Sequence, residues 1–203
     1  MFVCNNPQFI FIDIPKTGSR SIFKYLLGNF KNGQKTGNHQ LTIPPKSKTW
    51  FSFCVVRNPY DRMCSLYWST SKRANNADKD RYGYLGEMKK NKMENNLLNF
   101  CKIVEKRYRR GNPNNAFRSL QFMHVVPQHV YIEHNNFNTI LRFENLEKDF
   151  NQLPFITKHV ELPHENTTQE LRPHWTEMMD DPTIAQINKM YAKEFDMFGY
   201  EKL

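Results

Sequence analysis

Short apolar runs alternate with amphipathic segments along the chain. Residues 9–14 (FIFIDI) and 50–56 (WFSFCVV) are rich in aromatic and β-branched side chains, and residues 139–143 (TILRF) form a third run of this kind. Runs of this length and composition are typical of buried β-strands. Their nearly unbroken apolar character favours the interior of a parallel sheet. We therefore expect three strands at these positions.

Each of the first two runs is followed by a segment with helical periodicity. Residues 19–27 form the first of these, and Gly28 is expected to end it. Its expected inner face consists of Ile22, Phe23, Leu26 and Leu27. A second helix is expected to begin at Asn58, a good N-cap residue, with Pro59 in its first turn. Its expected inner face consists of Met63, Leu66, Tyr67 and Thr70.

Further helices are expected over residues 97–110, over residues 146–153 and from Asp181 onward. The inner face of the last one consists of Ile184, Ile187, Tyr191 and Phe195. Residues 31–48 are polar and are predicted to form a loop. Strands that alternate with helices predict an α/β fold, with a central parallel sheet flanked by helices.

Length and composition indicate one globular domain over residues 1–203. The chain is 39% hydrophobic and 14% aromatic, which favours a folded core over disorder. We find no internal repeat and no linker that would divide it. Residues 71–126 are polar and basic, and they are expected to be a largely helical region of the same domain.

The charge balance favours an anionic partner. Lysine and arginine number 29 against 20 aspartate and glutamate, a formal net charge of +9. A nucleotide, a polyanionic sugar, a nucleic acid or a membrane surface would each suit this charge. No run approaches the roughly 20 apolar residues that cross a bilayer, and the start MFVCNNPQ is too short and polar for a signal peptide. We therefore expect a soluble, cytoplasmic protein without a membrane span; its oligomeric state stays open.

The cysteines and histidines show no metal-ligand spacing. The four cysteines, which are Cys4, Cys54, Cys64 and Cys101, form no CxxC pair. We expect them to be reduced residues of the core rather than disulfide partners. The seven histidines include no HExxH pair, and no metal site is expected.

The segment IPKTGSRS, residues 14–21, lies between the first expected strand and the first expected helix. Backbone N–H groups and the positive end of the helix dipole bind anions at such junctions. Gly18 allows a close approach of the backbone, and a cation and three hydroxyl groups surround it, from Lys16, Thr17, Ser19 and Ser21. A Walker A loop has its lysine after several glycines, whereas Lys16 precedes the only glycine here. This order argues against a standard ATP loop; the alternative to an anion site is an ordinary turn with a surface lysine.

The segment RNPYDRMCS, residues 57–65, repeats the strand-to-helix arrangement. Arg57 stands where the second strand ends, and Ser65 lies two turns into the following helix. An arginine and a serine held in this way would suit a second phosphate, separate from the first. The alternative is a well-capped helix whose arginine bonds a backbone carbonyl.

Together and in this order, the two motifs resemble those of the PAPS-dependent sulfotransferases, where PAPS is 3′-phosphoadenosine 5′-phosphosulfate. PKTGSRS is similar to the family's 5′-phosphosulfate loop, and RNPYDRMCS is similar to its 3′-phosphate motif. The carbohydrate sulfotransferase branch is the most similar, through IPKTG, VRNPYDR, RFENL at 142–146 and KEFDMFGY at 193–200. The resemblance spans nearly the whole chain, although residues 71–126 are idiosyncratic; in a protein of this family they would help to shape the site of the acceptor. Arg20 departs from the small or hydroxyl residue usual in the family, so its role stays open.

This resemblance implies a P-loop-like nucleotide-binding fold and a metal-independent transfer of the sulfuryl group of PAPS to an acceptor hydroxyl. It implies that Lys16 stabilises the leaving oxygen, and that Arg57 and Ser65 bind the 3′-phosphate. The 5′-phosphosulfate would be bound by the loop residues Lys16, Thr17, Gly18, Ser19, Arg20 and Ser21. The branch has a catalytic base in a histidine after the first helix, and His39 is the nearest match. A surface histidine is the alternative for His39, and Glu144 is the second candidate for the base.

The acceptor implied by the resemblance is a carbohydrate, although a small alcohol, a phenol or a protein tyrosine stays open. The basic side chains of the middle region would suit an anionic glycan, or they form a solvated helix face; they are Lys89, Lys90, Lys92, Lys102, Lys106, Arg107, Arg109 and Arg110. Gln128 and His129 are further candidates for acceptor contacts. Two other functions are alternatives: an ATP-dependent, kinase-like transferase with a degenerate loop, and a non-enzymatic module that binds nucleic acid. The loop order opposes the first, and the paired motifs are unexplained by the second.

Overall fold

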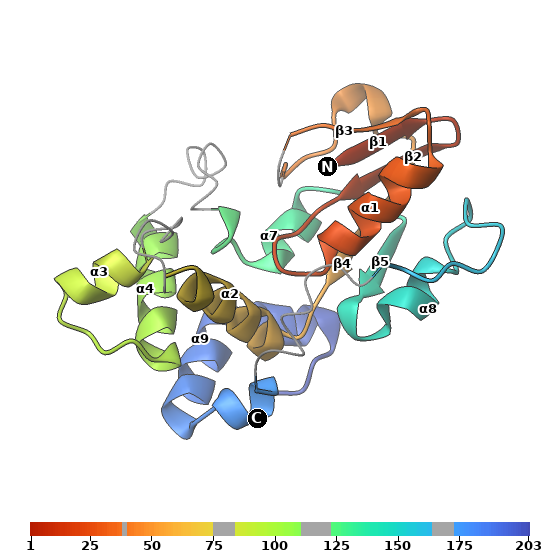
Figure 1. The fold of residues 1–203 in the computed structure, drawn as a ribbon. Helices are drawn as coiled ribbons and strands as arrows, with labels where there is room; N and C mark the ends of the chain where they lie inside the picture. Colours follow the sequence, from red (N-terminus) through yellow and green to blue (C-terminus); the bar gives the residue numbers. More distant parts are fainter. Residues whose placement is uncertain (38–39, 75–83, 111–122, 164–172) are drawn as a thin grey trace. The chain divides into compact units, whose positions relative to one another are not determined.

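The computed structural model describes residues 1–37, 40–74, 84–110, 123–163 and 173–203 (Figure 1). The chain forms two compact units, which are described separately. The first contains Met1–Arg57 and Gln128–Asn166, and the second contains Asn58–Pro127 and Thr167–Leu203. The α/β arrangement expected from the sequence is confirmed, with the strands in the first unit and the longest helices in the second. The assignment of residues 1–203 to one domain stays a prediction.

The first unit is built on a five-stranded sheet. Its strands are β1 (Phe2–Asn5), β2 (Gln8–Ile12), β3 (Gly33–Lys35), β4 (Phe51–Val56) and β5 (Thr139–Arg142), in the order β3-β1-β2-β4-β5. Strands β2, β4 and β5 run parallel, as expected for the three apolar runs. Strand β1 is antiparallel to both of its neighbours, so the sheet is mixed rather than wholly parallel.

The two strands outside the parallel core were not expected from the sequence. Strand β1 is only four residues long, and β3 has the polar sequence GQK. An edge strand is held through its backbone hydrogen bonds and needs no apolar side chains. The polar composition of residues 31–48 therefore predicted a loop. That expectation is wrong for β3 and for the 3₁₀ helix η1 (Pro45–Ser47).

The core of the first unit is aromatic. Helix α1 (Ser19–Asn29) lies beside the strands (Figure 1) and buries Ile22, Phe23 and Leu26. Phe11 of β2 stacks on Phe53 of β4 with ring centroids 4.9 Å apart, and Phe9 of β2 stacks on Phe155, which follows helix α8 (Leu146–Phe150). Two details of α1 were expected wrongly. Leu27 is 52% exposed, and the helix continues through Gly28 to Asn29.

The second unit is helical. It consists of α2 (Pro59–Ala74), α3 (Tyr84–Lys90), α4 (Leu97–Arg110), the 3₁₀ helix η4 (Trp175–Met178) and α9 (Asp181–Phe198). The expected start of α2 is confirmed, since the Asn58 Oδ1 atom accepts from the Tyr60 N–H at 2.9 Å. Helix α4 has the expected bounds, and α3 was not expected. The core joins α2, α3, α4 and α9 through Tyr60, Tyr84, Phe100 and Phe195.

All four cysteines are buried and free, as the sequence indicated. Burial raises the pKa of the Cys54 and Cys101 thiols, which makes them poor nucleophiles. Within the ranges that the structure describes, none of the helices combines the length and apolar character that a membrane span needs.

Candidate nucleotide-binding site

The loop between β2 and α1 has a backbone shaped for close contacts. Lys16 has φ 72° and Gly18 has φ 85°, so both residues are left-handed. For a lysine this conformation costs about 1 kcal/mol, and strain of this kind clusters at functional sites. Turns of this kind direct successive N–H groups toward one point and form anion-binding concavities. The loop geometry therefore supports the anion site over an ordinary turn.

Thr17 holds this loop in place. Its side chain is fully buried, and its Oγ1 atom donates a hydrogen bond to the Ile14 carbonyl at 2.9 Å. The hydroxyl is thus engaged inside the protein. The contribution that Thr17 can make to an anion is its backbone N–H.

The N-terminus of α1 follows directly. Gly18 is the N-cap residue, no side chain caps the helix, and its first turn contains no acidic residue. The positive end of the helix dipole is therefore not neutralised by a carboxylate of this turn. Ser19 and Ser21 are half-buried and Arg20 is exposed, so all three belong to the surface around this helix end.

Arg57 joins the loop to the end of the neighbouring strand. The residue is 4% exposed, and its Nη1 atom donates to the Lys16 carbonyl oxygen at 3.0 Å. The carboxyl ends of adjacent parallel strands meet at one edge of a sheet, which is the usual place for ligands in α/β proteins. The structure therefore brings together Arg57 and Lys16, one residue of each motif, which lie 41 positions apart in sequence. The Asn58 cap and this bond to a backbone carbonyl are both features of the alternative to a phosphate site, but the carbonyl belongs to the candidate anion loop itself.

Phe143 completes this edge from the third parallel strand. It begins the 3₁₀ helix η3 (Phe143–Asn145), directly after β5. The Arg57 guanidinium lies over the Phe143 ring, 3.8 Å from its centroid. A Cβ atom at Gly18 would lie 2.9 Å from two carbons of the same ring. Phe143 was not predicted to belong to the site, although its position at the end of an expected parallel strand places it at the same edge of the sheet.

Gln128, the first residue of helix α7 (Gln128–Glu133), also contacts Arg57. It is fully buried, and its side-chain amide bonds both polar groups of the Arg57 backbone. The acceptor contact expected for Gln128 stays a prediction, and both ends of its amide are engaged within the protein. The two residues lie 71 positions apart, and no local sequence signal connects them.

Three further residues were expected in the site, which are Ser65, His39 and Glu144. Ser65 lies in the second unit, on α2, where it is 5% exposed. Its share in a phosphate site stays a prediction. His39 lies outside the described residues. Glu144, the second candidate base, is exposed in η3.

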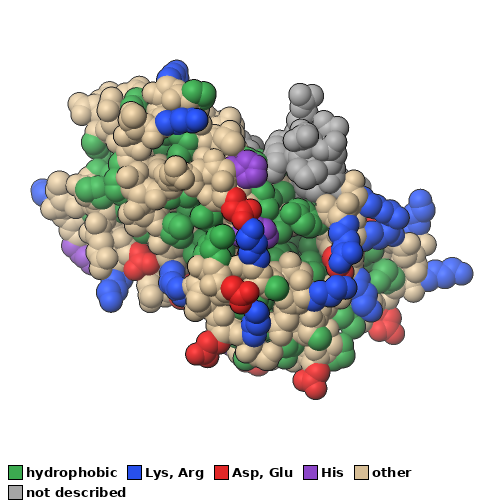
Figure 2. All heavy atoms as spheres, turned by 180° about the vertical axis from the view of Figure 1, so that it is seen from behind, with side chains coloured by type: hydrophobic (Ala, Val, Ile, Leu, Met, Phe, Trp, Pro, Cys, Tyr) green, Lys and Arg blue, Asp and Glu red, His purple; other side chains and the backbone are tan. Residues whose placement is uncertain are grey.

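The basic side chains of the second unit are partly neutralised. Figure 2 shows lysine and arginine side chains gathered near α3 and α4. Glu87 pairs with Arg107 at 2.7 Å and with Lys106 at 3.5 Å. Burial raises the Glu87 pKa, but the hydrogen bond and charge of Arg107 and the nearby Lys106 lower it on balance. The alternative of a solvated helix face, with its own ion pairs, therefore accounts for part of the positive charge in this region.

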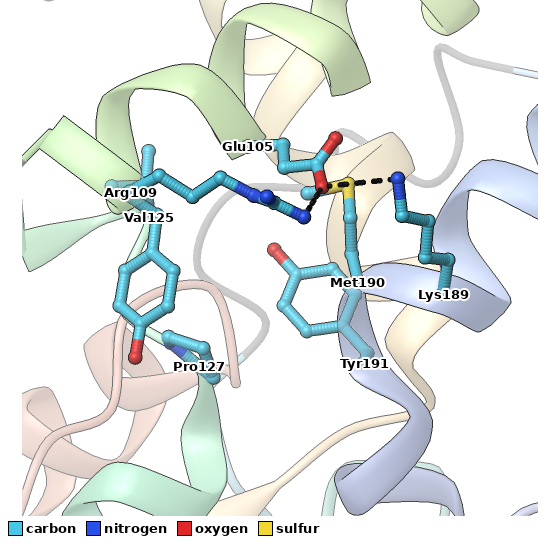
Figure 3. Close-up of a pocket in the computed structure, with 8 residues that line it drawn as sticks. Glu105, Arg109, Val125, Pro127, Lys189, Met190 and Tyr191 are labelled. Carbon is cyan, nitrogen blue, oxygen red and sulfur yellow. Dashed lines mark hydrogen bonds and ion pairs between the residues drawn. The ribbon is translucent and has the colours of Figure 1, made fainter.

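A small pocket of about 170 Å³ lies within the second unit (Figure 3). Glu105 stands on its rim between Arg109 at 2.6 Å and Lys189 at 3.6 Å, and the Tyr191 ring lines its wall. Burial raises the pKa of the Tyr191 phenol. None of the residues predicted for the nucleotide site lines this pocket. In the part of the chain that the structure describes, no cluster of three or more His, Cys, Asp or Glu side chains could hold a metal.

A left-handed loop and an uncapped helix end at the carboxyl edge of parallel strands, with an arginine that follows the next strand, are features typical of anion sites in α/β proteins. Comparison with known protein families identifies the class of enzyme. A sequence model described as the sulfotransferase family matches residues 1–201, and the chain belongs to this family of enzymes. The family membership confirms the resemblance found from PKTGSRS and RNPYDRMCS.

Curated relatives agree with the family. The chain is 26% identical to carbohydrate sulfotransferase 10 of Mus musculus over 247 residues, which cover 100% of the chain and 67% of the relative. The protein of the same name from Rattus norvegicus gives the same values. The one from Homo sapiens is 24% identical over 246 residues, with the same coverage. The comparison with solved structures found no significant match.

Proposed function

We propose that this sulfotransferase moves the sulfuryl group of PAPS to a hydroxyl group of a carbohydrate and releases adenosine 3′,5′-bisphosphate. The family supports the reaction class, and the names of the curated relatives support a carbohydrate acceptor. The observation that carries the proposal is the hydrogen bond from Arg57 to the Lys16 carbonyl, because it joins the two motifs required for the two ends of PAPS.

The residues at the loop fit the 5′-phosphosulfate end of the donor. They offer backbone N–H groups at an uncapped helix end, the ammonium of Lys16 and the hydroxyls of Ser19 and Ser21. Charge-assisted hydrogen bonds of this kind are about twice as strong as neutral ones. Arg57 fits the 3′-phosphate, and Ser65 is its proposed partner from α2.

In the proposed reaction, the bond between sulfur and the bridging oxygen breaks and a bond between sulfur and the acceptor oxygen forms. Negative charge develops on the bridging oxygen, where Lys16 and the N–H groups of the loop stabilise it. The acceptor hydroxyl gives its proton to a base, for which His39 is proposed. Atoms and charge balance without a further reactant, and catalysis consists mainly of positioning and electrostatic stabilisation.

The acceptor is proposed to be a glycan, and an anionic glycan would suit the basic residues of the second unit that Glu87 and Glu105 leave uncompensated. Lys89 and Lys90 end α3 and are exposed. Their charge would raise the association rate of a polyanion and would make it dependent on salt.

Thermal-shift titration tests the donor. The protein would be titrated with adenosine 3′,5′-bisphosphate, with ADP, and with ATP plus Mg²⁺. A ligand at about 100 times its Kd adds about 2.7 kcal/mol of stability, and we expect this from the bisphosphate at concentrations where ADP has little effect. Equal or better stabilisation by ATP would favour the kinase-like alternative.

A transfer assay tests the acceptor. The protein would be incubated with PAPS and a panel of neutral and anionic oligosaccharides, and products would be detected by mass spectrometry. We expect a sulfated sugar and an equal amount of bisphosphate. Sulfation of a phenol or a tyrosine peptide, with all sugars unchanged, would refute the carbohydrate acceptor. Binding to RNA or DNA that falls steeply with salt, without any transfer, would favour the nucleic-acid alternative.

A further inference from the structure

The side chain of Gln128 forms a two-sided hydrogen-bonded pair with the backbone of Arg57. The Arg57 N–H donates to the Gln128 Oε1 atom at 2.9 Å, and the Gln128 Nε2 atom donates to the Arg57 carbonyl at 2.9 Å. Gln128 has no exposed surface, so water does not compete for these bonds. An amide that bonds both the N–H and the C=O of one residue takes the place of the backbone hydrogen bonds that a neighbouring strand would make.

This hydrogen-bonded pair lies directly after the last residue pair between β4 and β5. Strand β4 ends at Val56, whose partner in β5 is Arg142, the last residue of that strand. Arg57 therefore follows the last registered pair, and its backbone is bonded by a side chain instead of a strand. Arg57 is also the last residue of the first unit before the chain leaves it, and Gln128 is the residue at which the chain returns.

The backbone of Arg57 sets the direction of its guanidinium. That group lies over Phe143 at 3.8 Å and bonds the Lys16 carbonyl at 3.0 Å. A residue at the end of a strand, next to a helix start, would otherwise have several backbone conformations available. Gln128 restricts Arg57 to one of them, so the guanidinium is positioned before any ligand binds.

We infer that Gln128 is a positioning residue for Arg57, and that it sets the affinity for the 3′-phosphate of the donor without touching the donor. The inference rests on the proposed function, because it assigns the 3′-phosphate to Arg57. It differs from a general structural role in one measurable way. Loss of Gln128 should weaken a ligand with a 3′-phosphate more than a ligand without one.

The test is a calorimetric titration of adenosine 3′,5′-bisphosphate and of adenosine 5′-phosphate, which differ only in the 3′-phosphate. The variants are Gln128→Met, which has a similar shape without the amide, and Gln128→Asn, which keeps the amide on a shorter side chain. Gln152→Met is the matched control, since Gln152 is an exposed residue of the same unit. The selectivity is the ratio of the two dissociation constants.

We expect Gln128→Met to weaken binding of the bisphosphate by about 10- to 100-fold, as for the loss of one or two buried hydrogen bonds. Binding of adenosine 5′-phosphate should change much less, so the selectivity falls. Gln128→Asn should lower the selectivity similarly, because the amide on the shorter side chain does not reach both the N–H and the carbonyl of Arg57. This second variant keeps the test decisive if Gln128→Met does not fold. In an Arg57→Ala background, the change at Gln128 should have little further effect on selectivity.

Two results would overturn the inference. Unchanged selectivity in both Gln128 variants would show that Arg57 is positioned without Gln128, and an equal loss for both ligands would show a general structural role. A wild-type protein that does not prefer the bisphosphate would instead refute the proposed function, and the role of Gln128 with it. The Gln152→Met control should match the wild type throughout.

Discussion

Replacement of Gly18 by alanine should destabilise the protein and disturb the arginine next to it. Gly18 has φ 85°, a conformation that costs an alanine about 1 kcal/mol or more. The new Cβ atom would also lie 2.9 Å from the Phe143 ring and 3.2 Å from the Leu146 side chain. Shifts of this kind in a packed site cost about 1–3 kcal/mol.

The two costs add, and the stiffer unfolded chain of the variant offsets up to about 1 kcal/mol of them. The expected loss in the free energy of unfolding is therefore about 2 kcal/mol. For a chain of this size, this lowers the Tm by roughly 4–8 °C. Because Phe143 supports the Arg57 guanidinium, its displacement should also weaken binding of the bisphosphate.

Urea denaturation of Gly18→Ala and Gly28→Ala measures this effect with a control in the same helix. Gly28 lies inside α1 without a positive φ, and a Cβ atom there would meet nothing within 4 Å. Gly28→Ala should therefore stabilise the protein by about 0.5–1 kcal/mol, through better helix propensity. A Gly18→Ala protein as stable as the wild type would refute both the left-handed loop and its contact with Phe143.

Four further changes test the site and the helices. Arg57→Lys keeps the charge but not the planar group over Phe143, and titration should show bisphosphate affinity lowered by about 10-fold or more; unchanged affinity would contradict the stacking. Lys16→Ala should lower kcat by about 10²- to 10³-fold in a transfer assay with the bisphosphate still bound. His39→Ala should lower kcat by about 10²-fold or more with unchanged donor affinity, and near-normal turnover would remove it from the mechanism. Asp180→Ala should cost about 1 kcal/mol at pH 7, because Asp180 caps α9 through the Thr183 N–H at 3.0 Å. The hydrogen bonds from Thr183 lower the Asp180 pKa, so urea denaturation should show this difference fully above about pH 4 and shrinking below it.

Local sequence signals predicted the parts of the fold that depend on local physics. The apolar run of β4, the Asn58 cap of α2 and the bounds of α4 all follow from side-chain periodicity and capping. Gly28 shows the limit of such signals. A glycine usually ends a helix, but α1 continues because Leu26 and the residues before it are buried against the sheet.

The sequence predicted the residues that would contact an anion, but not the residues that hold them in place. Lys16, Gly18 and Arg57 were found from the motifs, and the structure joins them at one edge of the sheet. Phe143 and Gln128 were missed as supporting residues, because their contacts with Arg57 join segments far apart in sequence. Neither motif contains information on such contacts. The cytoplasmic location and the roles of Ser65 and His39 stay predictions.

The central claim is that the Lys16 loop and Arg57 bind the two ends of PAPS. Direct titration of the wild type and of Arg57→Ala with adenosine 3′,5′-bisphosphate and ADP tests it. We predict that the wild type prefers the bisphosphate by at least about 100-fold, the equivalent of two charge-assisted hydrogen bonds, and that Arg57→Ala removes most of this preference. Equal affinities for the two nucleotides in the wild type, or a preference that survives in Arg57→Ala, would contradict it.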